Sequence, residues 1–143
     1  MTMDMEPGAV ARRSWDVWNG GDLDALDALV DDESQNFGQP SGKARTRAIL
    51  SAWRTAFPDL TFVVEEEIVH EDRVAHRVTV RGTYLGTFKL LGLESVKPTG
   101  RSFEVMQIHM SRVRNGRTVE HWGARDDLGM LRQLGVLPVS VAP

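Results

Sequence analysis

The chain has 143 residues, and its 20 acidic and 17 basic side chains give a formal charge of −3 at pH 7. That balance argues against a nucleic-acid-binding surface, which usually shows as a concentrated basic patch, and no apolar run is long enough for a signal peptide or a membrane span. Cysteine is absent, which excludes disulfides, thiolate metal sites and cysteine nucleophiles and is typical of a reducing compartment. We therefore expect a cytoplasmic protein without nucleic-acid or membrane partners.

The first part of the chain is predicted to be helical. Apolar residues at helical spacing predict a helix over residues 9–19, and a glycine pair follows it. Asp22 is a suitable N-cap for a second helix from Leu23 to Val30. A third helix is predicted from Lys43 to Phe57, where Pro58-Asp59 ends it.

The remainder is predicted to be mostly strand. Alternating apolar and polar residues predict a hairpin of strands 60–70 and 73–84 and a second hairpin over 102–126. A loop over 85–101 connects them, and a short helix over 128–134 follows the second hairpin. Helices followed by an antiparallel sheet indicate the α+β class.

The domain organisation is predicted to be simple. The sequence contains no internal repeat, low-complexity tract or interdomain linker, so we expect a single domain over 1–143. Residues 1–8 and 136–143 are expected to be loosely ordered tails of that domain.

Asn115-Gly116 predicts the register of the second hairpin. Asn and Gly both tolerate the positive φ of a type I′ turn, so Arg114 should pair with Arg117 across it. Continuing this register opposes His109 to Trp122, and alternate pairs then share one face of the sheet. The predicted inner face carries these residues: Phe103, Val105, Gln107, His109, Trp122, Ala124 and Asp126.

A β-bulge in this hairpin would change the prediction. One extra residue in either strand exchanges the two faces beyond it, and bulges are common next to active sites. In that case Asp127 rather than Asp126 would be the inward carboxylate.

Several short segments occur in a recognisable order along the chain. They are Trp18 to Leu26, Ala56-Phe57-Pro58-Asp59-Leu60, Gly82-Thr83-Tyr84, Pro98-Thr99-Gly100-Arg101 and Glu120-His121-Trp122 with Asp126-Asp127-Leu128-Gly129. Together they resemble the SnoaL-like polyketide cyclases, within the nuclear transport factor 2-like and ketosteroid isomerase-like superfamily. The match spans nearly the whole chain, and its end, with His-Trp, a following Asp and Leu-Gly-Met-Leu-Arg-Gln-Leu-Gly, resembles the cyclase branch most.

The resemblance implies a cone-shaped α+β barrel, in which the N-terminal helices pack on a curved antiparallel sheet around a pocket. It also implies a small, polycyclic or polyketide-like substrate, no cofactor, and a homodimer or homotetramer. Cyclases of this branch close a ring by intramolecular aldol condensation, with an aspartate as acid and base near a histidine and a glutamine. Asp126, His109 and Gln107 match these residues best.

The residues themselves allow these roles and simpler ones. Asp126 would act as acid and base in an apolar surround, or a carboxylate here would cap the terminal helix, for which Asp127 is the better placed. Gln107 would donate to an enolate oxygen. His109 lies on the order of 13 Å from Asp126 along the strand, so the two would meet only through the substrate, unless His109 is a structural histidine packed against Trp122.

Further candidates come from the helices and the polar segment 31–42. The resemblance suggests that Asn36 supplies a hydrogen bond at the pocket floor. Trp53 and Phe57 are either helix core or aromatic residues that a lid helix presents to a flat ligand, and Trp122 is a further candidate for substrate contact. The histidines lack the spacing of paired metal ligands, so no metal site is expected.

These observations predict a cofactor-free cyclase that closes a ring on a polyketide-like intermediate. Two alternatives remain from the same residues. One is a cofactor-independent hydroxylase of an aromatic polyketide, and the other is a non-catalytic small-molecule-binding or dimerisation domain.

Overall fold

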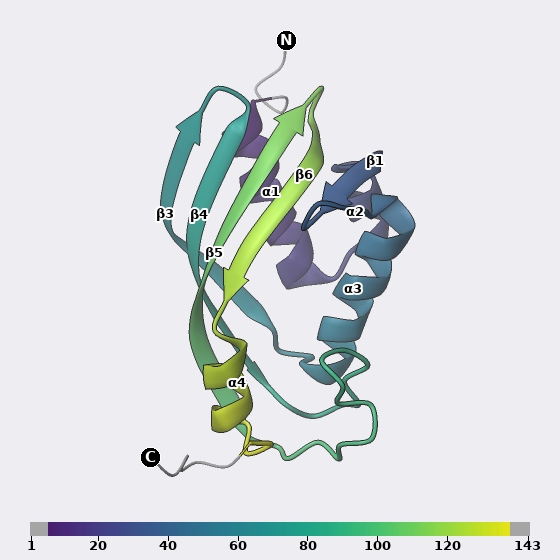
Figure 1. Ribbon diagram of the computed structural model, residues 1–143, viewed down its shortest axis with the longest axis vertical. Coiled ribbons are helices and arrows are strands. Elements are labelled where there is room, and N and C mark those ends of the chain that lie inside the picture. The colour runs from purple at the N-terminus through teal and green to yellow at the C-terminus, as the bar shows by residue number, and fades with distance from the viewer. Residues whose placement is uncertain (1–5, 138–143) are drawn as a thin grey trace.

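Four helices and six strands make up residues 6–137, the part of the chain that the computed structural model describes (Figure 1). The helices are α1 (Pro7–Gly20), α2 (Leu23–Asp27), α3 (Gly42–Ala56) and α4 (Asp127–Gln133). The strands are β1 (Val30–Asn36), β2 (Gln39–Pro40), β3 (Thr61–His70), β4 (Arg73–Thr83), β5 (Ser102–Arg114) and β6 (Arg117–Arg125).

The strands form one curved sheet in the order β2-β1-β6-β5-β4-β3. Helix α1 packs on β3 and β5, and α3 packs on β1, so the helices cover the concave side of the long strands (Figure 1). This confirms the cone-like α+β class. One detail of the prediction was wrong: β1 runs parallel to β6, so the sheet is mixed rather than antiparallel throughout.

The helix boundaries follow local sequence signals. Gly21, with φ of 71°, ends α1 in the left-handed region, and the Asp22 side chain accepts hydrogen bonds from the backbone amides of Asp24 and Ala25 as the predicted N-cap. Helix α2 is shorter than predicted because Val30 already pairs with Thr118 in the sheet.

The structure differs from the expected tails at both ends. Helix α1 begins at Pro7, inside the range 1–8 that was expected to be loosely ordered, because proline suits the first helical position. At the other end Val136 packs against the main core. The rest of the expected tails, residues 1–5 and 138–143, lies outside the described part of the chain.

A bulge in β6 overturns half of the predicted inner face. Arg114 pairs with Arg117 and Val113 with Thr118, as predicted, and positive φ values at Asn115 and Gly116 confirm the turn. Arg112 then pairs with Glu120, which leaves Val119 as an extra residue. Beyond this bulge β6 presents the opposite residues to the cavity: the inner face carries His121, Gly123 and Arg125 in place of Trp122, Ala124 and Asp126.

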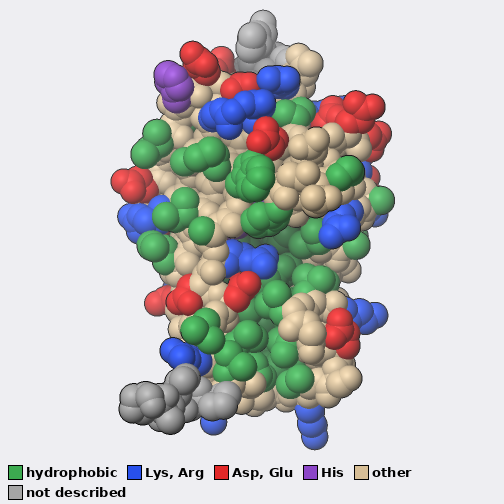
Figure 2. Space-filling view, in the orientation of Figure 1, with side chains coloured by type: hydrophobic (Ala, Val, Ile, Leu, Met, Phe, Trp, Pro, Cys, Tyr) green, Lys and Arg blue, Asp and Glu red, His purple; other side chains and the backbone are tan. Residues whose placement is uncertain are grey.

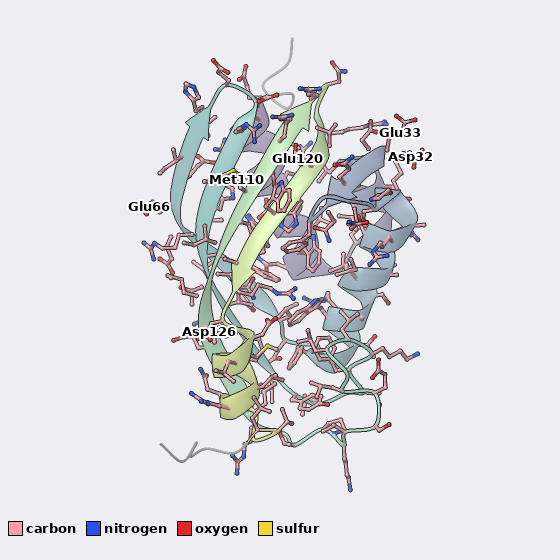
Figure 3. The ribbon with its side chains drawn as sticks, viewed as in Figure 1. Asp32, Glu33, Glu66, Met110, Glu120 and Asp126 are labelled. Atoms are coloured by element: carbon pink, nitrogen blue, oxygen red, sulfur yellow. The ribbon has the colours of Figure 1, made fainter. Side chains whose placement is uncertain are left out.

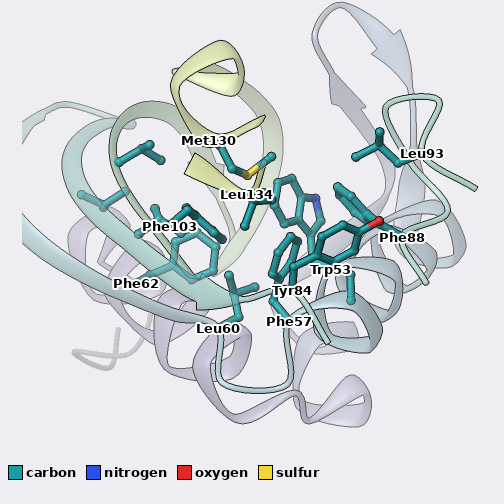
Figure 4. Close-up of a cluster of buried hydrophobic side chains, with 14 residues drawn as sticks. Trp53, Phe57, Leu60, Phe62, Tyr84, Phe88, Leu93, Phe103, Met130 and Leu134 are labelled. Carbon is teal, nitrogen blue, oxygen red and sulfur yellow. The ribbon is translucent and has the colours of Figure 1, made fainter. Parts of the chain in front are cut away.

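The main core lies at the end of the sheet near α4 (Figure 4). Phe57 is fully buried there among the rings of Trp53, Tyr84, Phe88 and Phe103. Phe57 is therefore a core residue.

No helix within residues 6–137 is long and apolar enough to cross a membrane.

Candidate active site

A cavity of about 150 Å³ lies between the concave face of the sheet and helices α1 and α3. Figure 2 shows a hollow on this side of the molecule, with hydrophobic side chains gathered around it and basic side chains at its border. Large apolar residues make up much of the wall: Trp15, Trp18, Ile49, Trp53 and Phe62. Such a lining favours a ligand with an apolar body.

The structure separates the predicted site residues into two groups. Asn36, Trp53, Gln107 and His109 all line the cavity, although they come from three elements, β1, α3 and β5. Phe57, Trp122 and Asp126 are not among the lining residues. Trp122 instead lies opposite Met110 on the outer face and is 44% exposed.

Asp126 caps a helix. Its Oδ1 atom accepts a hydrogen bond of 2.8 Å from the backbone amide of Gly129, and Figure 3 shows it beside the first turn of α4. The side chain is exposed to solvent. The bulge at Val119 is the physical reason, because it turns the end of β6 by one residue. Asp127 does not line the cavity either, so the expected exchange of the two carboxylates does not occur.

A chain of short hydrogen bonds connects four polar side chains in the cavity. Asn36 Oδ1 lies 2.7 Å from His121 Nδ1, His121 Nε2 lies 2.8 Å from His109 Nδ1, and His109 Nε2 lies 2.8 Å from Gln107 Oε1. The two imidazoles stack with their ring centres 5.1 Å apart. Three strands, β1, β6 and β5, supply the members.

Counting hydrogens shows what this chain requires. Two neutral imidazoles bring one N–H each, whereas three contacts need three hydrogens. The third must come from the NH₂ group of Asn36 or Gln107, and a half turn of either terminal amide supplies it. When Asn36 accepts from His121, His121 Nε2 accepts from His109 Nδ1. His109 Nε2 then carries an electron pair that accepts a hydrogen bond from the turned Gln107 amide.

Both imidazoles are neutral at pH 7. Burial, followed by the charges of His121 and Arg125, lowers the pKa of His109 to about 3. Burial and Arg125 lower the pKa of His121 to about 4. The neutral forms that the hydrogen count assumes are therefore the populated ones.

A third histidine holds the wall of the cavity in place. Trp15 Nε1 donates to His76 Nδ1 at 2.8 Å, so His76 carries its hydrogen on Nε2, which lies 2.9 Å from Glu67 Oε1. Burial alone would raise the pKa of Glu67, but the hydrogen bond with His76 and the charge of Arg12 outweigh it and lower that pKa. His76 is thus occupied on both nitrogens and orients the Trp15 ring.

Arg125 supplies positive charge. Its side chain lines the cavity, its Nη2 atom donates to Asp127 at 3.2 Å, and its guanidinium lies 5.7 Å from the centre of the Trp53 ring. The predicted inner face left out Arg125 and His121, because both belong to the face that the bulge turned inward. The signal that would have found them was the alternative register with one extra residue in β6.

No group of three or more His, Asp or Glu side chains in the described residues is arranged to hold a metal ion.

A glycine makes room for the histidine pair. A Cβ atom at Gly123 would lie 3.0 Å from His109 Nδ1 and 3.5 Å from the His121 ring.

The chain was compared with known proteins. No functionally curated protein matches it. The family model of the SnoaL-like polyketide cyclases matches residues 8–134.

Solved structures agree with this family model. IdmH from Streptomyces antibioticus, a candidate polyketide cyclase, is 33% identical with a TM-score of 0.77 over 92% of this chain and 99% of that one. TsrD from Streptomyces laurentii is 26% identical with a TM-score of 0.78, over 91% and 95% of the two chains. AclR from Streptomyces galilaeus, a candidate hydroxylase, is 29% identical with a TM-score of 0.77, over 95% and 84%. The chain therefore belongs to the SnoaL-like polyketide cyclase family.

Proposed function

We propose that the protein is a cofactor-free cyclase that closes a ring on a polyketide-like ketone by an aldol reaction, with His109 as the acid and base. The observation that carries this proposal is the hydrogen-bonded chain from Asn36 through His121 and His109 to Gln107, which lies in an apolar cavity. Of the two hydrogen arrangements, the one in which Asn36 accepts from His121 leaves the electron pair of His109 Nε2 facing Gln107, where it can remove a proton from a substrate.

The proposed reaction uses each member of the chain. The substrate displaces the Gln107 amide from His109, and His109 Nε2 removes a proton from the carbon next to a carbonyl. The resulting enolate carbon attacks a second carbonyl of the same molecule. The new alkoxide then takes the proton back from His109, so no proton, electron or atom is lost. Gln107, released from His109, donates its amide N–H to the enolate oxygen.

Electrostatics of the cavity support an enolate intermediate. Its lining residues include Arg125 but no Asp or Glu, and both His109 and His121 are neutral at pH 7. A negative charge that develops in the substrate therefore meets a cation and no like charge from the lining. The positive charge that His109 gains would be shared with His121, because His121 Nε2 can accept the Nδ1 hydrogen of His109 across the 2.8 Å contact.

The size of the cavity limits what can be enclosed. A volume of about 150 Å³ resembles that of an engineered cavity that holds benzene, so one ring or one forming ring fits. The rest of a larger substrate would lie at the mouth of the cavity, near Arg125.

Two reactions test the proposal. Phenylacetone in D₂O reports proton removal by α-deuterium uptake, and heptane-2,6-dione reports ring closure to 3-hydroxy-3-methylcyclohexanone. We expect the wild type to accelerate both and His109→Gln to lose about 100-fold or more. His70→Gln, at a histidine side chain that is 82% exposed, is the matched control. Acceleration that survives in folded His109→Gln would contradict the proposal.

A hydroxylase is the second candidate, because AclR is 29% identical to this chain. In that reaction the enolate of an aromatic substrate would reduce oxygen, so the product would form in air and fail to form under argon. Ring closure requires no oxygen. If neither proton exchange nor any product occurs, the remaining candidate is a non-catalytic binding domain.

We also propose that the protein is a cytoplasmic homodimer. Met106, Ile108 and Met110 of β5 and Trp122 of β6 are all exposed on the outer face of the sheet. Monomeric proteins seldom leave such contiguous apolar surface uncovered. A two-fold axis near β5 would pack this outer face of one protomer against the same face of its partner.

A further inference from the structure

Arg125 is the one permanently charged side chain that lines the cavity within the described residues. Its side chain is 29% exposed, which puts the guanidinium at the boundary between the cavity and solvent. The other lining residues are apolar, hydroxyl or amide side chains, and histidines. The cavity therefore has an apolar interior and a cation at its mouth.

The Arg125 guanidinium is held in place, and most of its N–H groups remain available to donate to a ligand. It has five N–H donors, of which one is occupied by Asp127 at 3.2 Å. Among residues 6–137 its Nε and Nη1 atoms make no hydrogen bond, and the ring of Trp53 lies 5.7 Å from its centre. A guanidinium fixed over an aromatic ring loses little freedom when it binds a ligand.

We propose that Arg125 and Trp53 form a subsite for the carboxylate, or another planar anionic group, of a ring-bearing substrate. The proposal rests on the proposed function, because it takes the cavity as the substrate site. The planar fork of an arginine binds a carboxylate through two parallel hydrogen bonds, and the neighbouring apolar cavity takes one ring. Benzoate has this shape.

The charges around the subsite support an anion over a neutral group. No carboxylate lines the cavity, so an entering anion meets no like charge from the wall. Asp127, which is outside the lining, is the group that competes for Arg125. Arg125 should therefore strengthen the binding of an anionic ligand, and Asp127 should weaken it.

Calorimetric titrations with benzoate and with benzyl alcohol test it, because the two probes share a ring and differ in charge. We expect the wild type to bind benzoate about tenfold more tightly than benzyl alcohol. Arg125→Gln should remove this preference by weakening benzoate about tenfold while leaving benzyl alcohol unchanged. Asp127→Asn should strengthen benzoate severalfold, and Arg117→Gln, at an exposed arginine outside the cavity, should change neither.

Equal binding of the two probes by the wild type would overturn the proposal, as would an unchanged preference in Arg125→Gln. If Arg125→Gln does not fold, Arg125→Lys decides the question, since it keeps the charge and loses the fork: it should bind benzoate less tightly than the wild type. The titrations require no turnover. A protein that prefers benzoate but does not exchange the protons of phenylacetone supports the anion subsite and contradicts the cyclase, and the reverse result does the opposite.

Discussion

The Nδ1 atom of His109 lies 2.8 Å from the Nε2 atom of His121, and the two rings stack in the wall of the cavity. The histidines are 12 positions apart and come from two strands. Their contact depends on the bulge at Val119, because an unbroken register would put Trp122 on this face instead.

Replacing His121 tests whether it positions His109. His121→Phe keeps a ring but removes both nitrogens, so His109 loses the acceptor that holds its hydrogen on Nδ1. We expect α-deuterium uptake by phenylacetone to slow about 10- to 100-fold, mainly in kcat. Nitrogen NMR of His109 should show a hydrogen on Nδ1 in the wild type and a mixture of tautomers in the variant. An unchanged tautomer would remove His121 from the mechanism.

Gly123→Ala perturbs the same pair without removing any polar group. The new Cβ would lie 3.0 Å from His109 Nδ1, so the ring must shift by a few tenths of an ångström. We expect a loss of activity and of about 1 kcal/mol in the free energy of unfolding. Gly20→Ala is the matched control, since nothing lies within 4 Å of its Cβ position, and it should be neutral or stabilising. Equal behaviour of the two variants would mean that the space at Gly123 is unimportant.

Asp126 is expected to contribute to stability rather than to catalysis. Asp126→Ala removes the hydrogen bond to the Gly129 amide and should lower the free energy of unfolding by about 1 kcal/mol. Asp126→Asn retains a capping oxygen and should cost less. Both variants should close heptane-2,6-dione at the wild-type rate per folded molecule. A large loss of rate in folded Asp126→Asn would restore the aspartate mechanism.

The buried histidines should make the protein sensitive to acid. Their folded pKa values, about 3 for His109 and about 4 for His121, lie below the ordinary value near 6.5 of the unfolded chain. As pH falls below 6.5, the histidines bind protons in the unfolded state but not in the folded state, so the free energy of unfolding falls. Between pH 7.5 and 5.0 each histidine should lower the free energy of unfolding by about 2 kcal/mol.

Urea unfolding at the two pH values measures this loss. The wild type should lose more stability between pH 7.5 and 5.0 than His121→Phe, by about 2 kcal/mol. His70→Gln should follow the wild type, because its side chain is 82% exposed. Parallel pH dependence of all three proteins would show that His121 is not held neutral.

Oligomeric state tests the outer face of the sheet. Ile108→Lys places a charge among Met106, Met110 and Trp122, and should convert a dimer to a monomer in sedimentation experiments. Leu128→Lys is the control, since Leu128 is also exposed, at 52%, but belongs to α4 rather than to β5 or β6. A wild type that sediments as a monomer at high concentration would contradict the dimer.

Much of the fold could be predicted because its signals are local. The glycine pair and Asp22 determined the boundary between α1 and α2, and Asn115-Gly116 determined the turn between β5 and β6. The alternation of apolar and polar residues in β5 also predicts its inner face, and Gln107 and His109 lie on that face as predicted. These features depend on backbone preferences and on burial of one face of one strand.

The inner face of β6 could not be predicted in the same way, because polar and apolar residues occur on both of its faces. Thr118, Glu120 and Trp122 alternate with Val119, His121 and Gly123, so neither set has the uniform apolar character that specifies a register. The inner face of β6 depends instead on contacts between segments that are far apart in the sequence. These are its parallel pairing with β1, the extra residue Val119 opposite β5, and the space that Gly123 leaves for His109. The turn, the strands and one histidine of the cavity follow from the pattern of amino acids along the chain. The inward placement of His121 and Arg125 and the capping role of Asp126 follow from long-range pairing, because a shift of one residue in a strand exchanges its two faces.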